Sequence, residues 1–286
     1  MKETFHIISD GSCDLPTELV QEKNITVVPF YVSFDDEHYF KEIAEIGVRD
    51  FYQQMVDRKG VYPKSSMPSI RDYEEVFLPF AEAGTPIICI CITTKFSGSM
   101  QSALNARSLV LEKHPQAEIT VIDATINTVL QGQYVLEAVS LRDNGVSYQD
   151  TVKRLEEIKS TGRIFFTVGN MEYLKHGGRI GKVAALAGGA LDIRPIITLR
   201  QGEIFPSGID RGRKRTLKKV MNLLLDYLKE SNLSIDCYSI AVGYGYDVEE
   251  GVAFRDQALS VLHDKGYAID EIPVYQIGAT ISVHTG

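Results

Sequence analysis

The stretch Pro86-Ile87-Ile88-Cys89-Ile90-Cys91-Ile92, followed by Thr94-Lys95-Phe96-Ser97-Gly98-Ser99-Met100-Gln101-Ser102-Ala103, decides the fold class. Its first part is a short, continuously apolar run, which is typical of a strand buried on both faces of a parallel sheet. After its second part, apolar residues recur at helical spacing. The polar segment therefore lies where a strand ends and a helix begins.

This junction is a candidate anion-binding site. At a helix N-terminus, unpaired backbone N–H groups and the helix dipole together attract negative charge. Ser97 and Ser99 add hydroxyl donors, and Gly98 allows an anion to approach the backbone closely. The alternative interpretation of the same Ser-Gly-Ser segment is an ordinary serine N-cap without a ligand.

The rest of the N-terminal sequence also alternates between strand and helix patterns. A strand is expected at residues 5–9, and the polar loop 10–16 then lies at a strand's carboxyl end, where open α/β sheets place ligand-facing residues. A helix is expected to begin after Ser69, because Asp72 completes a capping-box pattern. The segment 62–69 is rich in proline and serine, which predicts irregular structure. We predict an α/β region with a mainly parallel sheet flanked by helices.

The pattern changes near residue 164, and we predict two domains, 1–163 and 164–286. Residues 195–205 read as an antiparallel hairpin around Gln201-Gly202. Further strands are expected at 237–242 and 274–277, separated by a helix. These elements predict a C-terminal α/β domain with a mixed sheet.

Composition narrows the class of protein. The chain has 286 residues, of which 44% are hydrophobic and 24% charged, and a formal charge of −8 argues against general nucleic-acid binding. It contains no run of 18 apolar residues and no apolar leader, so we expect a cytoplasmic protein without stable membrane insertion. The cysteines lack metal-site spacing and are expected to be reduced core residues: Cys13, Cys89, Cys91 and Cys237. We predict neither a metal nor a cofactor.

A series of segments, in this order along the chain, resembles the DegV family, whose characterised members are bacterial fatty-acid-binding proteins. The resemblance implies the two-domain fold described above, with a long-chain fatty acid between the domains. The segments that carry it are Ser9-Asp10-Gly11-Ser12-Cys13-Asp14-Leu15, Ser65-Ser66-Met67-Pro68-Ser69, Ser97-Gly98-Ser99-Met100-Gln101-Ser102-Ala103, Val121-Ile122-Asp123, Glu172-Tyr173-Leu174-Lys175-His176-Gly177-Gly178-Arg179-Ile180, Arg211-Gly212-Arg213-Lys214 and His284-Thr285-Gly286.

The resemblance also implies a role and a set of head-group contacts. Family members of this kind are lipid carriers, not enzymes, and present the carboxylate to a separate fatty acid kinase, which forms the acyl phosphate from ATP for phospholipid synthesis. Carried over by position, the carboxylate contacts are Ser97, the Gly98 backbone, Ser65 and His284. Ser65 replaces the threonine usual in the family, and the family normally continues beyond its His-Thr-Gly motif.

A basic cluster in the C-terminal half has two interpretations. Arg211 and Arg213 precede a predicted helix, and Arg179 lies earlier in the Gly-Gly-Arg motif. Such a cluster is commonly a solvated helix face. In an acidic protein it also fits a docking surface for the kinase.

Two other functions remain as alternatives. A serine hydrolase or acyltransferase would use Ser97 as nucleophile and His284 as base, with an acid such as Asp123. Against it, the chain lacks the Gly-x-Ser-x-Gly nucleophile elbow. The sequence does not favour a transcriptional regulator, because it contains no helix-turn-helix pattern.

Overall fold

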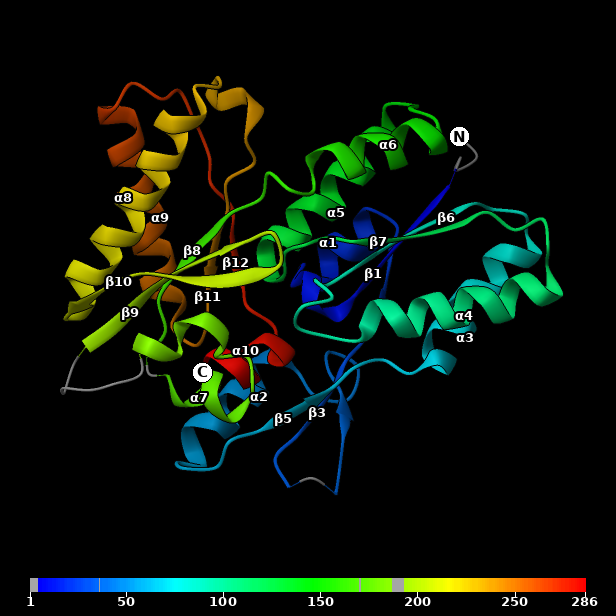
Figure 1. The fold of residues 1–286 in the computed structure, drawn as a ribbon, viewed down its shortest axis with the longest axis horizontal. Coiled ribbons are helices and arrows are strands. Elements are labelled where there is room, and N and C mark those ends of the chain that lie inside the picture. Colours follow the sequence, from blue (N-terminus) through cyan, green and yellow to red (C-terminus); the bar gives the residue numbers. More distant parts are fainter. Residues whose placement is uncertain (1–4, 36, 170, 187–192) are drawn as a thin grey trace.

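The computed structural model describes residues 5–35, 37–169, 171–186 and 193–286 (Figure 1). Its central element is a parallel four-stranded sheet with the order β2-β1-β6-β7. Every residue of β1 and β6 is buried, and for β6 this confirms the prediction from its apolar run. The bounds are β1 (His6–Asp10), β2 (Ile25–Val28), β6 (Ile87–Cys91) and β7 (Ile119–Asp123).

Helices cover both faces of this sheet, and alternate residues of each strand face opposite layers. On β1, Ile7 packs with α5 and α6, whereas Ile8 packs with α3 and α4. The capping box at Ser69 and Asp72 is present at the start of α3, as predicted. The helices of this part are α1 (Thr17–Glu22), α2 (Val48–Asp57), α3 (Ile70–Glu82), α4 (Ser99–Lys113), α5 (Thr128–Asp143) and α6 (Tyr148–Ile158).

The prediction that residues 62–69 are irregular is wrong in part. This segment contains β5 (Lys64–Ser66), which pairs antiparallel with β3 (Tyr31–Ser33), and β4 (Phe40–Lys41) pairs with the other edge of β3. The local composition is unfavourable for a strand, but pairing with β3 decides the outcome, because strand formation depends strongly on tertiary context. This pairing places Ser65 opposite Val32.

The C-terminal half contains strands of both orientations, as expected. β8 (Ile164–Phe166), β9 (Ile193–Arg200) and β10 (Glu203–Arg211) form an antiparallel sheet, while β11 (Val242–Tyr244) and β12 (Val274–Gln276) form a separate parallel pair. Helices α8 (Arg213–Ser231) and α9 (Val248–Asp264) pack beside them (Figure 1). The predicted strand at 237–242 is wrong in its position, because a short 3-10 helix, Ile235–Cys237, comes first.

Cys237 is exposed, contrary to expectation, and the other cysteines are buried and form no disulfide.

Two C-terminal segments return to the N-terminal half. Helix α10 (Ala279–Thr285) packs against α2 and α7 (Glu172–His176) (Figure 1). The buried carboxylate of Glu42 accepts the Thr280 N–H at 3.0 Å and the Phe30 N–H at 3.3 Å, fixing α10 in place. The turn of the β9–β10 hairpin lies against the loop after β7, where the Gly202 N–H donates to the Thr125 carbonyl at 2.7 Å.

Among the described residues, no helix is long and apolar enough to cross a membrane.

Candidate ligand-binding site

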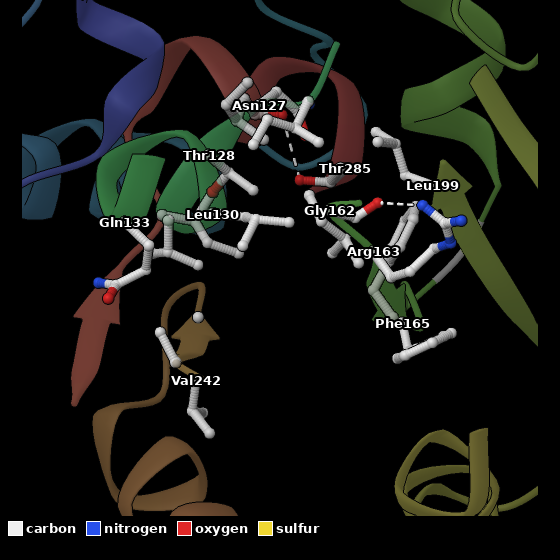
Figure 2. Close-up of a pocket in the computed structure, with 18 of the residues that line it drawn as sticks. Asn127, Thr128, Leu130, Gln133, Gly162, Arg163, Phe165, Leu199, Val242 and Thr285 are labelled. Atoms are coloured by element: carbon white, nitrogen blue, oxygen red, sulfur yellow. Dashed lines mark hydrogen bonds between the residues drawn. The ribbon is translucent and has the colours of Figure 1, made fainter. Parts of the chain in front are cut away.

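A cavity of about 1210 Å³ lies between the two halves of the chain (Figure 2). Figure 2 shows Leu130 from α5 on one side and Phe165 from β8 on the other, with Val242 from β11 below. Its volume lies above the usual range of about 300–1,000 Å³ for drug-sized ligands. The cavity therefore has room for a long apolar molecule.

The four residues predicted to bind the head group all line this cavity: Ser65, Ser97, Gly98 and His284. The Ser65 hydroxyl lies 3.1 Å from Nε2 of His284, across 219 positions of sequence. Met67 packs over Gly98 so closely that a methyl group at Gly98 would lie 2.7 Å from its sulfur. Polar groups from strand β5, the loop before α4 and helix α10 thus meet at the wall of the cavity.

Ser97 combines the two interpretations left open by the sequence. Its hydroxyl oxygen accepts the Ser99 N–H at 3.1 Å, so it satisfies one of the donors at the start of α4. A hydroxyl that accepts one hydrogen bond can still donate its own proton. The Ser97 proton can therefore be donated to a carboxylate in the cavity while the oxygen supports the helix.

His284 is held as a neutral imidazole. Burial, together with the positive charge of Arg179, lowers its pKa to about 4. Its Nδ1 lies against Gly177, the residue that follows α7, since a methyl group at Gly177 would lie 2.0 Å from that atom. The two ring nitrogens thus face different residues: Nε2 faces Ser65, and Nδ1 faces Gly177.

Arg179 has a structural role at the same end of the cavity. Its Nε and Nη2 donate to the Phe96 carbonyl at 3.1 and 3.0 Å, and its Nη1 donates to the Gly177 carbonyl at 2.6 Å. It therefore ties the residue before Ser97 to the residue beside His284. Arg179 and Arg213 both line the cavity.

The other two predicted docking arginines differ in their surroundings. Arg213 forms an ion pair with Glu250, with Nε 2.7 Å from Oε1. Arg211 ends β10 and is exposed. The three arginines therefore do not form a uniform basic face, because Arg213 is paired with Glu250.

The expectation that loop 10–16 faces the ligand is wrong. Asp10, Ser12 and Asp14 are buried in the core and lie outside the cavity lining. Asp10 lies behind the binding loop, residues 93–98, where it accepts hydrogen bonds from the Ile92 N–H and the Ser99 hydroxyl. The sequence signal for this arrangement is the aspartate at the end of the strand-like segment 5–10, because a charge at the end of a buried strand needs partners.

The low pKa of His284 predicts a loss of stability in acid. An unfolded chain binds a proton at this group near pH 6.5, and the folded chain only near pH 4. Between these values the unfolded state binds more protons, so the unfolding free energy falls as the pH falls, by about 2–3 kcal/mol in total. Urea unfolding from pH 7 to pH 4, with His284→Gln as the reference, measures this contribution.

The reference variant is necessary because burial raises the pKa of Asp10, Asp14 and Glu42, which favours the folded state as the pH falls. These carboxyl groups are common to both proteins, so the difference isolates His284. Parallel curves for the two proteins would contradict a neutral buried histidine.

Comparison with known proteins identifies the family. The model of the family described as "Uncharacterised protein, DegV family COG1307" matches residues 4–286. A DegV domain-containing protein of Clostridium acetobutylicum is 32% identical over 231 residues, covering 80% of this chain and 79% of that protein.

Solved structures agree with this result. A fat acid (stearic acid)-binding protein from Eubacterium ventriosum is 42% identical, with a TM-score of 0.93, over 99% of this chain and 94% of that one. A DegV family protein from Thermus thermophilus, whose structure describes fatty acid binding, is 27% identical, with a TM-score of 0.82, over 99% and 96% of the two chains. The chain therefore belongs to the DegV family.

Proposed function

We propose that this protein binds a long-chain free fatty acid in the cavity, with the carboxylate at Ser97, Gly98, Ser65 and His284. The observation that carries the proposal is the composition of the cavity wall: hydroxyl, amide and imidazole groups lie together at Ser65, Gly98 and His284, and apolar side chains such as Leu130, Phe165 and Leu224 line other parts of it. The stearic-acid-binding protein of Eubacterium ventriosum, with 42% identity over nearly the whole chain, supports the same ligand class.

The two ends of the ligand contribute differently. Burying a saturated tail contributes about 0.8 kcal/mol per methylene, so a sixteen-carbon acid gains on the order of 10 kcal/mol before the costs of association. Each hydrogen bond to the carboxylate contributes about 1.5–3 kcal/mol. The tail therefore dominates affinity, and the head-group contacts set orientation and the preference for a carboxylate.

We further propose that the bound carboxylate is presented to a separate fatty acid kinase. A carboxylate at a helix N-terminus that receives hydrogen bonds stays ionised, as a nucleophile toward ATP must be. Arg211, exposed at the end of β10, and Arg179 and Arg213 at the cavity are the proposed docking residues. Arg211→Glu is expected to lower acyl phosphate formation by a fatty acid kinase, and unchanged formation would contradict the docking role.

The contacts of the candidate triad favour a carrier over a serine hydrolase. His284 Nε2 is 3.1 Å from Ser65. Asp123 accepts hydrogen bonds from the Thr94 hydroxyl at 2.7 Å and from the Thr125 N–H at 2.7 Å. The acid is thus engaged with the loop backbone, whereas a triad requires it to orient the histidine.

The proposed function is tested by native mass spectrometry of the purified protein, followed by extraction of bound lipid. One intact free fatty acid per chain is the expected result. A covalent acyl adduct at Ser97 or turnover of acyl esters would support the hydrolase. If no lipid is bound and added fatty acids fail to bind, the proposal is rejected.

Ser97→Ala is expected to weaken fatty acid binding about ten- to hundredfold, because one hydrogen bond to the carboxylate is lost. Calorimetric titration measures the change. Ser108→Ala is the matched control, since Ser108 lies on the exposed face of α4, the helix that follows Ser97, and its hydroxyl donates to the Leu104 carbonyl. Equal affinity of the two variants would place the carboxylate elsewhere.

A further inference from the structure

Asp10 is buried behind the loop that carries Ser97, and its carboxylate is surrounded by hydrogen-bond donors. Its Oδ1 accepts from Ser12 Oγ at 2.6 Å and Gln131 Nε2 at 2.9 Å. Its Oδ2 accepts from the Ile92 N–H at 2.9 Å and Ser99 Oγ at 2.7 Å. Both oxygens act as acceptors, which is the arrangement that an ionised carboxylate requires.

The two partners of Oδ2 stand at opposite ends of the binding loop. Ile92 directly follows β6, and Ser99 is the first residue of α4. The Oδ2 atom of Asp10 therefore accepts a hydrogen bond from each end of the loop 93–98. The Ser99 hydroxyl is also 2.6 Å from the Tyr73 hydroxyl, which holds it from the other side.

Ser99 connects the Asp10 carboxylate to the residues that line the cavity. Its side chain donates to Asp10, and its backbone N–H donates to Ser97 Oγ at 3.1 Å. A change at Asp10 is thus transmitted to the Ser97 hydroxyl through a single residue. Ser99 is wholly buried, so water does not replace the bond when it is broken.

We propose that Asp10 is a positioning residue for the head-group site, which holds the Ser97 hydroxyl and the Gly98 amide in place and so sets the preference for a carboxylate over an uncharged head group. This inference rests on the proposed function. A buried negative charge by itself opposes a second anion nearby, so the contribution of Asp10 to acid binding is geometric and acts against its own electrostatic effect.

The test compares two ligands with the same tail, octadecanoic acid and 1-octadecanol, in the full-length chain. Asp10→Asn keeps the side-chain volume, but its amide nitrogen cannot accept from a donor. We expect this variant to bind the acid about tenfold more weakly and the alcohol almost unchanged, so that the acid-to-alcohol affinity ratio falls about tenfold. A general loss of stability would weaken both ligands together.

Two further variants make the result decisive. Ser9→Ala is the matched control, because Ser9 belongs to the same buried network, bonding Ile90 and Gln131, but does not touch the binding loop. Its ratio is expected to match the wild type. If Asp10→Asn does not fold, Ser99→Ala removes the same connection and is expected to lower the ratio.

Each outcome separates the inference from the proposed function. A wild-type protein that binds neither ligand refutes the proposed function and the inference with it. A wild type that prefers the acid, together with folded Asp10 and Ser99 variants of unchanged ratio, refutes the inference alone. Stronger acid binding by Asp10→Asn also refutes it, because the electrostatic effect would then outweigh the positioning.

Discussion

Octadecanoic acid is expected to bind this protein about a thousandfold more tightly than dodecanoic acid. The two acids share a head group and differ by six methylenes, each contributing about 0.8 kcal/mol when buried, or about 5 kcal/mol together before imperfect contacts reduce the gain. The cavity of about 1210 Å³ has room for the longer tail. Displacement of a fluorescent fatty acid, at free concentrations below the solubility limit of each acid, measures the ratio.

This comparison distinguishes burial of the tail from attachment by the head group alone. If only the polar end held the ligand, the two acids would have equal affinities, and the proposed orientation would be wrong. The matched alcohols provide a control, because their affinity ratio reports the tail without the carboxylate. A similar ratio for acids and alcohols is expected, since the two ends of the ligand contact different parts of the cavity.

Gly177→Ala is expected to weaken fatty acid binding about ten- to hundredfold, although Gly177 itself makes no predicted ligand contact. Its added methyl group would lie 2.0 Å from His284 Nδ1, so the imidazole must move. The backbone at Gly177 has ordinary helical angles, φ −71° and ψ −7°, which alanine adopts readily, and the next contact of its methyl group is the Tyr173 carbonyl oxygen at 3.0 Å. The effect therefore comes from displacement of His284 away from Ser65.

Gly178→Ala is the control for this experiment. Gly178 has a φ of +68°, where alanine is strained, but its methyl group would meet nothing within 4 Å. It is expected to lower the unfolding free energy by about 1 kcal/mol and leave fatty acid affinity unchanged. If the two variants weaken binding equally, the loss at Gly177 would reflect general damage to the turn, and the placement of His284 would not be its cause.

The sheet and the loop at Ser97 could be predicted from sequence because their signals are local. β6 is apolar at every position, which few structures other than a strand covered on both faces accommodate. The helix after it begins at Ser99, inside the polar segment 94–103 where the sequence predicted the junction of strand and helix. By contrast, β5 is specified by its partner β3, and its own residues, Lys64–Ser66, give no strand signal.

The rest of the site depends on contacts that sequence patterns do not contain. Ser65 and His284 are 219 positions apart, and only the resemblance to a family predicts that they lie in the same site. The charge of Arg179 predicts a docking role, but nothing in the sequence indicates its hydrogen bonds to the carbonyls of Phe96 and Gly177. The division at residue 163 stays a prediction.

The return of α10 to the N-terminal half also determines the order of events during biosynthesis. The Glu42–Thr280 contact spans 238 positions, and a contact of such separation forms only after a large loop closes. The strands of the parallel sheet leave the ribosome much earlier, since β7 ends at Asp123. A growing chain can therefore assemble its sheet long before it can bring His284 to Ser65. Completion of the head-group site is thus a late step of folding, because it requires α10 (Ala279–Thr285).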